Sequence, residues 1–274
     1  MPNKICLIVG TKNEANALHA FLEKHVWADE ILVTDSFSTD DTAEVCREYN
    51  RTYFQAHLSG NANARHNIAI KQCISDWVLL IDPDELISEE LKKEILFVLN
   101  NQKCEFSAFE FLRVNYFMNR PLRHGGWSGY SLKMFRKGCV EFKGDSYHEN
   151  PVVNGKVGRL RGEVLHYPNP NIHWIMEKFN YISEFDLQGY SNRYGVLSPG
   201  RFKWLLLTRP LKNFWKCYFK KKGYKDGLHG FIYAMLIWAQ DVIRICKYGE
   251  KFIIKNPNLV PQEKLPDPWE CRKK

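Results

Sequence analysis

The chain has 274 residues, of which 45% are hydrophobic, 26% charged and 14% aromatic. This composition is too apolar for a disordered chain and too charged for a protein that spans a membrane several times. The net charge of +8 is unevenly distributed, because residues 1–200 carry a net charge of −3 and residues 201–274 carry +11. A near-neutral body is followed by a basic region, and the two need separate explanations.

The cysteines and the apolar segments indicate the compartment. Eight cysteines are scattered along the chain without a Cys-x-x-Cys pair, so we expect thiols of a cytosolic protein rather than disulfides or a cysteine metal site. The apolar run Ile5–Val9 is too short for a signal peptide and is typical of a buried strand. No apolar segment has the roughly 20 residues of a transmembrane helix. We therefore expect a cytoplasmic protein, held peripherally at the inner face of the cell membrane.

Strand-like and helix-like segments alternate over the first hundred residues. Short apolar runs predict strands at 5–9, 30–35, 52–56 and 77–82. Apolar residues at helical spacing predict helices at 13–25, 39–49 and 62–74. This alternation predicts a parallel sheet covered by helices.

The rest of the chain changes character twice. Its β-rich part has predicted strands at 106–117, 130–135, 140–142 and 163–167. Helical segments follow at 172–190, 202–222 and 227–248, and a proline-containing irregular tail covers 255–274. We therefore separate residues 1–168 from a basic helical region, residues 169–274.

Polar residues follow the predicted parallel strands, where open sheets of this kind bind their ligands. The residues at these positions are Thr11, Asn13, Glu14, Asp35, Asp82 and Asp84. A buried strand that delivers an Asp-x-Asp pair to this edge suits a divalent cation that also holds a diphosphate, because hard cations prefer carboxylate oxygens. The alternative is a turn that leads into a helix capped by Ser88. Asp35 could accept hydrogen bonds from a nucleobase or a ribose.

Two common nucleotide-binding motifs are absent from the sequence. Residues 10–13, after the first strand, lack the Gly-x-Gly-x-x-Gly pattern, which argues against a dinucleotide-binding Rossmann domain. No P-loop sequence is present, which excludes a P-loop kinase. The nucleotide site, if there is one, must be of another type.

Three segments together resemble the family 2 glycosyltransferases of the GT-A fold. They are Ile8–Glu14 (IVGTKNE), Asp35–Thr42 (DSFSTDDT) and Trp77–Glu85 (WVLLIDPDE). Residues 60–67 (GNANARHN) also resemble the sugar-nucleotide loop of that family. Further segments resemble the lipopolysaccharide-core (WaaE-like) glycosyltransferases, namely 126–127, 133–137, 147–149, 165–167, the helix that contains Lys178, and 223–230.

This resemblance implies both a fold and a division of the chain. The implied fold is α/β of the GT-A type, with a Rossmann-like, mostly parallel sheet flanked by helices, a β-rich acceptor-side insert and a C-terminal helical region. Residues 1–104 would form the nucleotide-sugar half of a catalytic domain that covers residues 1–168. Residues 105–168 would form its acceptor half.

The resemblance also implies a donor site. Asp35 would bind the uridine base, and Thr11 and Glu14 would line the nucleotide pocket, with Asn13 beside them. Asp82 and Asp84 would bind the ribose and the metal–diphosphate group, with Mg²⁺ or Mn²⁺ as the metal.

Several basic residues are further candidates for this site. His166 ends a predicted strand, where a lone histidine is usually a packed residue, but neutral imidazole could complete the metal site as it does late in the chain of GT-A enzymes. Arg65 could contact the phosphates or the acceptor. The same holds for Lys133 or Arg136, although each of these charges taken singly is more typical of a solvated surface.

The acceptor hydroxyl needs a base within hydrogen-bond reach. Glu149, in the His148-Glu149 pair, is the candidate, and Asp145 is the reserve. Relatives often carry an acid directly after Gly-Trp, whereas Ser128-Gly129 follow here, which puts more weight on Glu149. One base that drives one in-line attack predicts inversion at the anomeric carbon.

The basic region interleaves Lys and Arg with Trp, Phe and Tyr over residues 201–255. Basic amphipathic helices of this kind suit an anionic membrane surface. The alternative is a helical subdomain with a solvated basic rim, and both descriptions can hold together.

We therefore predict an inverting, metal-dependent glycosyltransferase that moves a sugar from a nucleotide-sugar donor, UDP-linked, to a lipopolysaccharide-core or other cell-surface glycan. A sugar-1-phosphate nucleotidyltransferase is the first alternative, and the missing Gly-rich triphosphate loop argues against it. A non-catalytic membrane or nucleic-acid binding module is the second, and the ordered acidic strand ends argue against it. We expect no nucleic-acid partner.

Overall fold

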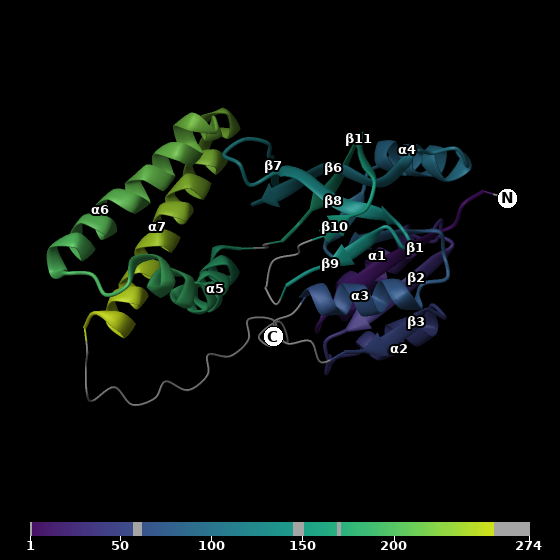
Figure 1. The fold of residues 1–274 in the computed structure, drawn as a ribbon, viewed down its shortest axis with the longest axis horizontal. Coiled ribbons are helices and arrows are strands. Elements are labelled where there is room, and N and C mark those ends of the chain that lie inside the picture. The colour runs from purple at the N-terminus through teal and green to yellow at the C-terminus, as the bar shows by residue number, and fades with distance from the viewer. Residues whose placement is uncertain (1, 57–61, 145–150, 169–170, 255–274) are drawn as a thin grey trace. The chain divides into compact units, whose positions relative to one another are not determined.

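The computed structural model describes residues 2–56, 62–144, 151–168 and 171–254. Within these, the chain forms two compact units, drawn in Figure 1: unit 1 contains residues 2–114 and 129–166, and unit 2 contains residues 115–128 and 167–254. The segment 115–128, which the sequence placed in the acceptor half, thus groups with the C-terminal helices. The candidate bases Asp145 and Glu149 lie outside the described residues.

Unit 1 is built on a large mixed sheet and a separate pair of strands. The strands of this unit are β1 (Ile5–Thr11), β2 (Glu30–Asp35), β3 (Thr52–Gln55), β4 (Trp77–Ile81), β5 (Glu85–Ile87), β6 (Phe106–Phe117), β8 (Gly129–Arg136), β9 (Val140–Phe142), β10 (Pro151–Val153) and β11 (Lys156–His166). Its helices are α1 (Ala15–Lys24), α2 (Thr42–Glu48), α3 (Ala62–Gln72) and α4 (Glu89–Asn100).

The order of strands in the main sheet is β3-β2-β1-β4-β8-β6-β11-β5, and β7 (Arg120–Leu122) pairs with the end of β6. Strands β3, β2, β1 and β4 are parallel neighbours, and antiparallel pairing begins at β8. Strands β9 and β10 form a separate antiparallel pair. The α/β fold class expected from the sequence is confirmed, and the β-rich insert extends the parallel sheet.

Side chains of β1 alternate between two cores, because successive residues of a strand point to opposite faces. Ile5, Leu7 and Val9 pack with α1, α2 and α4 on one face, whereas Cys6 and Ile8 pack with α3 on the other. Strands buried on both faces have continuous apolar sequences, which is why β1 and β4 were predictable. The sheet therefore holds the carboxyl ends of its parallel strands in a fixed register.

Among the element boundaries that differ from the expected ones, two differ for local reasons. Helix α2 begins at Thr42 rather than at residue 39, because the Asp40 carboxylate accepts hydrogen bonds from the backbone nitrogens of Thr42 and Ala15 and so shapes the preceding loop. Strand β11 begins at Lys156 rather than at residue 163, and its first half alternates exposed charged residues with Gly and Leu. The Ser88 cap is confirmed, since its hydroxyl accepts a hydrogen bond from the Leu91 nitrogen at 3.2 Å.

Gly162 allows helix α4 to lie directly on β11. A Cβ atom at this position would lie 2.3 Å from the backbone nitrogen and the Cα of Leu91. We expect Gly162→Ala to lower the free energy of unfolding by about 1–3 kcal/mol, because two backbones must move apart. Urea unfolding measures this change, with Gly129→Ala as the control, since a Cβ at Gly129 meets no atom within 4 Å. Equal stability of the Gly162 variant and the control would contradict the packing.

Unit 2 consists mainly of three long helices. They are α5 (Ile172–Tyr194), α6 (Pro199–Trp215) and α7 (Gly227–Phe252), with a π-helical turn η1 (Lys216–Lys220) and a 3₁₀ turn η2 (Gly223–Asp226) between the last two. Their shared core contains Leu187, Tyr190, Leu205, Ile245 and Tyr248. In the described part of the chain, no helix is both long enough and apolar enough to span a membrane.

The segment 115–128 is attached to this helical unit through its Gly-Trp motif. The Trp127 ring stacks on Tyr233 of α7, with ring centroids 4.9 Å apart. His124 contacts Asp226 through both its backbone nitrogen, at 2.8 Å, and its ring Nδ1, at 2.9 Å. The motif that resembles lipopolysaccharide-core enzymes therefore anchors a loop of unit 2.

Candidate active site

The Asp-x-Asp segment forms a tight turn at the carboxyl end of β4. The backbone nitrogen of Glu85 donates a hydrogen bond to the carbonyl oxygen of Asp82, and the nitrogen of Asp82 donates to a carboxylate oxygen of Glu85, each at 3.0 Å. The short strand β5 then begins at Glu85 and pairs with β11. The turn is thus closed by a buried carboxylate.

Glu85 is the centre of a buried ionic cluster. Its side chain is 0% exposed, and its two carboxylate oxygens lie 3.1 and 3.0 Å from the Nζ of Lys133 on β8. Arg113 on β6 donates from its Nε to the same carboxylate. A buried carboxylate requires such partners, because an unpaired charge away from water is strongly unfavourable. Lys133 was expected to be a solvated charge, and that expectation is wrong because the lysine is buried against Glu85.

The same two cations face Asp82, whose side chain remains 46% exposed at the edge of the sheet. Its Oδ2 lies 3.5 Å from Lys133 Nζ and 3.8 Å from Arg113 Nη2. Desolvation would raise the pKa of the Asp82 carboxyl, but the charges of Lys133, Arg113 and Arg65 outweigh this effect and hold the pKa well below its usual range. Asp82 is therefore an ionised acceptor.

Asp84 and His166, for which the resemblance implies a role as metal ligands, lie close to each other. His166 ends β11 and pairs in register with Glu85 of β5, which brings its ring to the Asp-x-Asp turn. Its Nε2 lies 3.5 Å from Oδ1 of Asp84. Two ligands that bind one ion at about 2.1 Å lie about 3 Å apart, so a small movement allows both to bind it. The carboxylate suits Mg²⁺ or Mn²⁺ with added water ligands, and a neutral imidazole can serve as a further ligand of a divalent transition metal.

The end of β1 carries a buried hydroxyl. Thr11 is buried, and its Oγ1 has no hydrogen-bond partner among the described residues. Arg65 on α3 passes close to Gly10, where a Cβ would lie 3.2 Å from a guanidinium nitrogen. The Arg65 Nη1 lies 3.5 Å from the hydroxyl of Ser36. A cation and an unused hydroxyl thus lie at the ends of β1 and β2.

The other predicted nucleotide residues have local contacts of their own. Asp35 is buried, and its carboxylate accepts hydrogen bonds from Ser38, from the Tyr53 hydroxyl at 2.7 Å and from Gln55 at 3.1 Å. Contact with a base would therefore require one of these bonds to be exchanged. The side-chain oxygen of Asn13 accepts from the Thr39 nitrogen at 2.8 Å, which ties the loops after β1 and β2 together. Glu14 is half-buried directly before α1.

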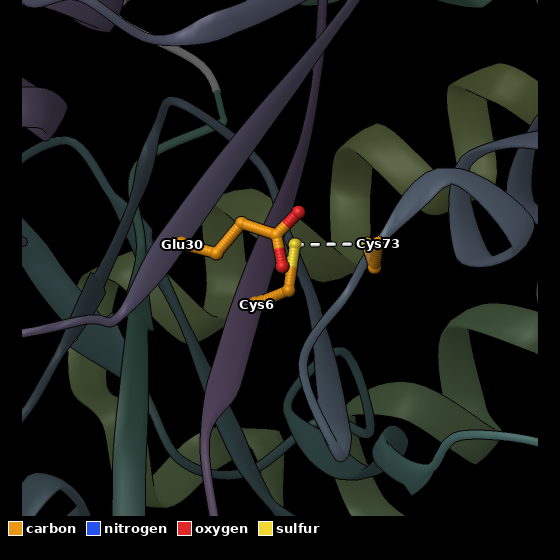
Figure 2. A group of neighbouring side chains, drawn as sticks. All are labelled: Cys6, Glu30 and Cys73. Atoms are coloured by element: carbon orange, nitrogen blue, oxygen red, sulfur yellow. Dashed lines mark hydrogen bonds between the residues drawn. The ribbon is translucent and has the colours of Figure 1, made fainter.

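A separate cluster lies at the opposite ends of the strands (Figure 2). Cys6, Glu30 and Cys73 place their ligand-type atoms within 4.8 Å of one another. The Cys73 thiol donates to the Cys6 sulfur at 2.8 Å, and this bond together with burial raises the pKa of the Cys6 thiol. Glu30 accepts hydrogen bonds from Ile74 and Ser75. These contacts fasten the end of α3 to β1 and β2. The seven described cysteines are free thiols.

The sequence profile of "Glycosyl transferase family 2" matches residues 6–150, which is more than half of the chain. This match covers the whole parallel part of the sheet and the Asp-x-Asp turn. The chain belongs to glycosyl transferase family 2. The resemblance seen in the sequence is therefore confirmed at the level of the family.

Relatives of this glycosyltransferase align over almost its full length. A protein of Rickettsia felis described as an uncharacterized glycosyltransferase is 26% identical over 284 residues, which cover 98% of this chain and 97% of that protein. The lipopolysaccharide core biosynthesis glycosyltransferase LpsC of Rhizobium meliloti is 28% identical over 274 residues, which cover 93% of this chain and 94% of LpsC.

Two solved structures are similar at low identity. The mannosyltransferase PcManGT from Pyrobaculum calidifontis, in complex with GDP-Man and Mn²⁺, gives a TM-score of 0.47 at 14% identity, over 90% of this chain and 74% of that chain. TarS residues 1–349 from S. aureus, in complex with UDP-GlcNAc, gives a TM-score of 0.44 at 17% identity, over 89% of this chain and 83% of that chain.

In this glycosyltransferase the predicted site residues form two groups. Asp82, Asp84 and His166 meet at the β4–β5 turn, and the residues at the ends of β1 and β2 are linked by Thr11 pairing in register with Asp35. Sequence reasoning missed the role of Glu85 and overlooked Arg113 altogether. The one available signal was that Arg113 lies on a strand whose neighbours are mostly apolar or aromatic.

Proposed function

We propose that this glycosyltransferase is an inverting, metal-dependent enzyme that moves a sugar from a UDP-linked donor to a lipopolysaccharide-core or other cell-surface glycan. The observation that carries the proposal is the pairing of Asp84 with His166 beside an ionised Asp82 at the carboxyl edge of the sheet. The full-length similarity to LpsC supports the class of acceptor. We further propose that the protein works in the cytoplasm, peripherally at the inner membrane face.

The donor would bind along the ends of β1, β2 and β4. Asp84 and His166 would hold Mg²⁺ or Mn²⁺, which when bound neutralises the charge of the leaving diphosphate. Asp82 would accept hydrogen bonds from ribose hydroxyls. Arg65 would contact a phosphate, and the unpartnered Thr11 hydroxyl would donate to the nucleotide. Glu14, Asn13 and Asp35 would complete the nucleotide pocket, with Asp35 toward the uracil.

Glu85 would act as a positioning residue for this site. It touches neither the proposed donor nor the metal, but it fixes Lys133 and Arg113 so that both cations face Asp82. Groups whose charges are oriented before the substrate arrives do not need to reorganise during the reaction. The buried cluster would thus keep Asp82 ionised and in one orientation.

The acceptor hydroxyl would lose its proton to Glu149, or to Asp145 if Glu149 lies out of reach. Both lie outside the described residues, so their roles are carried over from the sequence. A carboxylate base suits an attack from the side opposite the leaving diphosphate. Transfer with one such attack inverts the anomeric configuration.

A donor screen tests the proposal. We expect UDP-sugars to raise the melting temperature in the presence of Mn²⁺, because a ligand at a hundred times its Kd stabilises the folded state by about 2.7 kcal/mol. GDP- and dTDP-sugars should give smaller shifts, and removal of the metal should reduce the UDP-sugar shift. UDP release with lipopolysaccharide-core acceptors then measures turnover.

Two results of this screen would contradict the proposal. If no nucleotide sugar stabilises the protein, with or without metal, the proposed donor site is contradicted. Pyrophosphate release from UTP and a sugar-1-phosphate would indicate a nucleotidyltransferase instead. The anomeric configuration of the product, read by NMR, would decide between inversion and retention.

A further inference from the structure

Helix α6 carries a continuous stripe of exposed large apolar side chains. The stripe consists of Trp204, Leu207, Leu211 and Trp215, which are between 57% and 68% exposed. A spacing of three or four residues places side chains on one face of a helix. We call these four residues the α6 stripe. Large apolar side chains that gather in this way on a surface mark an interaction site.

The opposite face of α6 is firmly packed within unit 2. Leu205 and Pro210 are buried, and Phe202 packs into the space left by Gly249 of α7. Arg209 lies over the ring of Tyr190, 4.7 Å from its centroid. The helix is therefore held by one face, and the stripe is presented by the other.

The stripe is surrounded by positive charge. Residues 199–222 contain eight Lys and Arg residues and no Asp or Glu. Lys203 lies to one side of the stripe along the helix, and Lys212 and Lys216 lie to the other, all of them exposed. Long lysine side chains beside an apolar face can extend their ammonium groups to the headgroups of a lipid layer.

The apolar surface continues past the end of α6. Phe219 in η1 and Phe231 in α7 are both exposed, and both rings contact Phe214, with centroids 6.5 and 6.2 Å away. Leu228, one turn before Phe231, is also exposed. The α6 stripe and these residues belong to one helical hairpin.

We propose that the α6 stripe inserts into the headgroup region of an anionic phospholipid bilayer, with its lysines on the anionic lipids. The inference deepens the proposed function, because it names the surface that would hold the enzyme near a membrane-linked acceptor. The positive charge beside the stripe favours anionic lipids over a second copy of this chain, because a second copy would bring an equally basic helix against the first. The stripe has tryptophans at both ends and leucines between them, an arrangement typical of helices that lie in a membrane interface.

Vesicle flotation of the full chain tests this inference. We expect binding to vesicles of phosphatidylcholine with phosphatidylglycerol, weaker binding to phosphatidylcholine alone, and loss of the difference at high salt. Leu207→Ser with Leu211→Ser should weaken binding to the anionic vesicles at least tenfold, because two exposed leucines no longer insert. Phe97→Ser is the control, since Phe97 on α4 of unit 1 is even more exposed than the two leucines.

A second pair of substitutions tests the electrostatic contribution to vesicle binding. Lys212→Gln with Lys216→Gln should weaken binding to anionic vesicles by about fivefold per charge and leave binding to phosphatidylcholine unchanged. Neither pair of variants should alter the thermal stabilisation by UDP-sugars, so failure of vesicle binding and failure of the donor site are distinguishable.

Three outcomes would overturn the inference. The first is no binding to anionic vesicles at low salt. The second is equal loss of binding in the Phe97 control and in the stripe variant. The third is evidence that the stripe binds another partner. Such evidence would be a wild-type dimer in light scattering that the variant with both leucines replaced converts to a monomer, or DNA binding that this variant abolishes while vesicle binding persists.

Discussion

Replacing Asp84 by asparagine is expected to lower the rate of sugar transfer by at least about 10²–10³-fold while the protein stays folded. The loss follows from the proposed metal site, because removing one group that stabilises developing charge typically has an effect of this size. Asparagine keeps the shape of the side chain but not its charge. Asp84 lies on a partly exposed turn, so the free energy of unfolding should change by only about 0.5 kcal/mol.

The measurement is UDP release with a UDP-sugar, Mn²⁺ and an acceptor, alongside thermal unfolding of the same preparation. Asp76→Asn is the matched control, because Asp76 lies at the other end of β4 and accepts a hydrogen bond from the Lys4 nitrogen at 2.8 Å, which asparagine can also accept. His166→Ala should reduce metal-dependent stabilisation by the donor in the same direction. Full turnover by the Asp84 variant would remove the proposed mechanism.

The parallel half of the sheet could be predicted from the sequence because its strands are buried on both faces. Ile5–Val9 and Trp77–Ile81 are continuous apolar runs, and the polar residue that follows each run marks the edge of the sheet. In the structure, the register of β1 and β2 places Thr11 beside Asp35 at this edge. The resemblance added the family, and the profile match confirmed it.

The antiparallel half was less predictable because its pattern depends on distant partners. The first half of β11 alternates exposed charged residues with buried positions that include Gly158 and Gly162. Because glycine has no side chain, these buried positions do not produce the alternating apolar pattern by which a strand is recognised. Strand β5 has three residues and exists because β11 pairs with it. Such short elements have no sequence signal of their own.

The ionic cluster around Glu85 was missed for the same reason. In the sequence, Glu85 ends an acidic turn and looks solvated. Its burial depends on Lys133, 48 positions away, and on Arg113, 28 positions away, which reach it from two antiparallel strands. A buried charge can be recognised only when its partners are known, whereas Asp84 and His166 could be proposed from the chemistry of their side chains.

Replacing Glu85 by alanine should have the largest effect on stability. It removes the buried carboxylate that Lys133 contacts at 3.0 Å, and Asp82, 3.5 Å away and partly exposed, is a weaker replacement. Breaking a buried ion pair by removing one partner typically costs about 3–5 kcal/mol. Urea unfolding measures this loss. Glu85→Gln keeps the volume and part of the hydrogen bonding, so its loss should be smaller. An alanine variant as stable as the wild type would contradict the described cluster.

A double variant separates the structural role of Glu85 from its positioning role. Glu85→Met with Lys133→Met replaces the buried pair by apolar side chains of similar size, which often restores or improves stability. Arg113 can remain paired with Asp82, whose side chain is partly exposed. If Glu85 and Lys133 position Asp82, the double variant should be stable but bind the donor more weakly, with a raised KM for the UDP-sugar and a smaller change in kcat. Unchanged donor KM in a stable double variant would show that the cluster serves folding alone, because Asp82 would then hold its orientation without it.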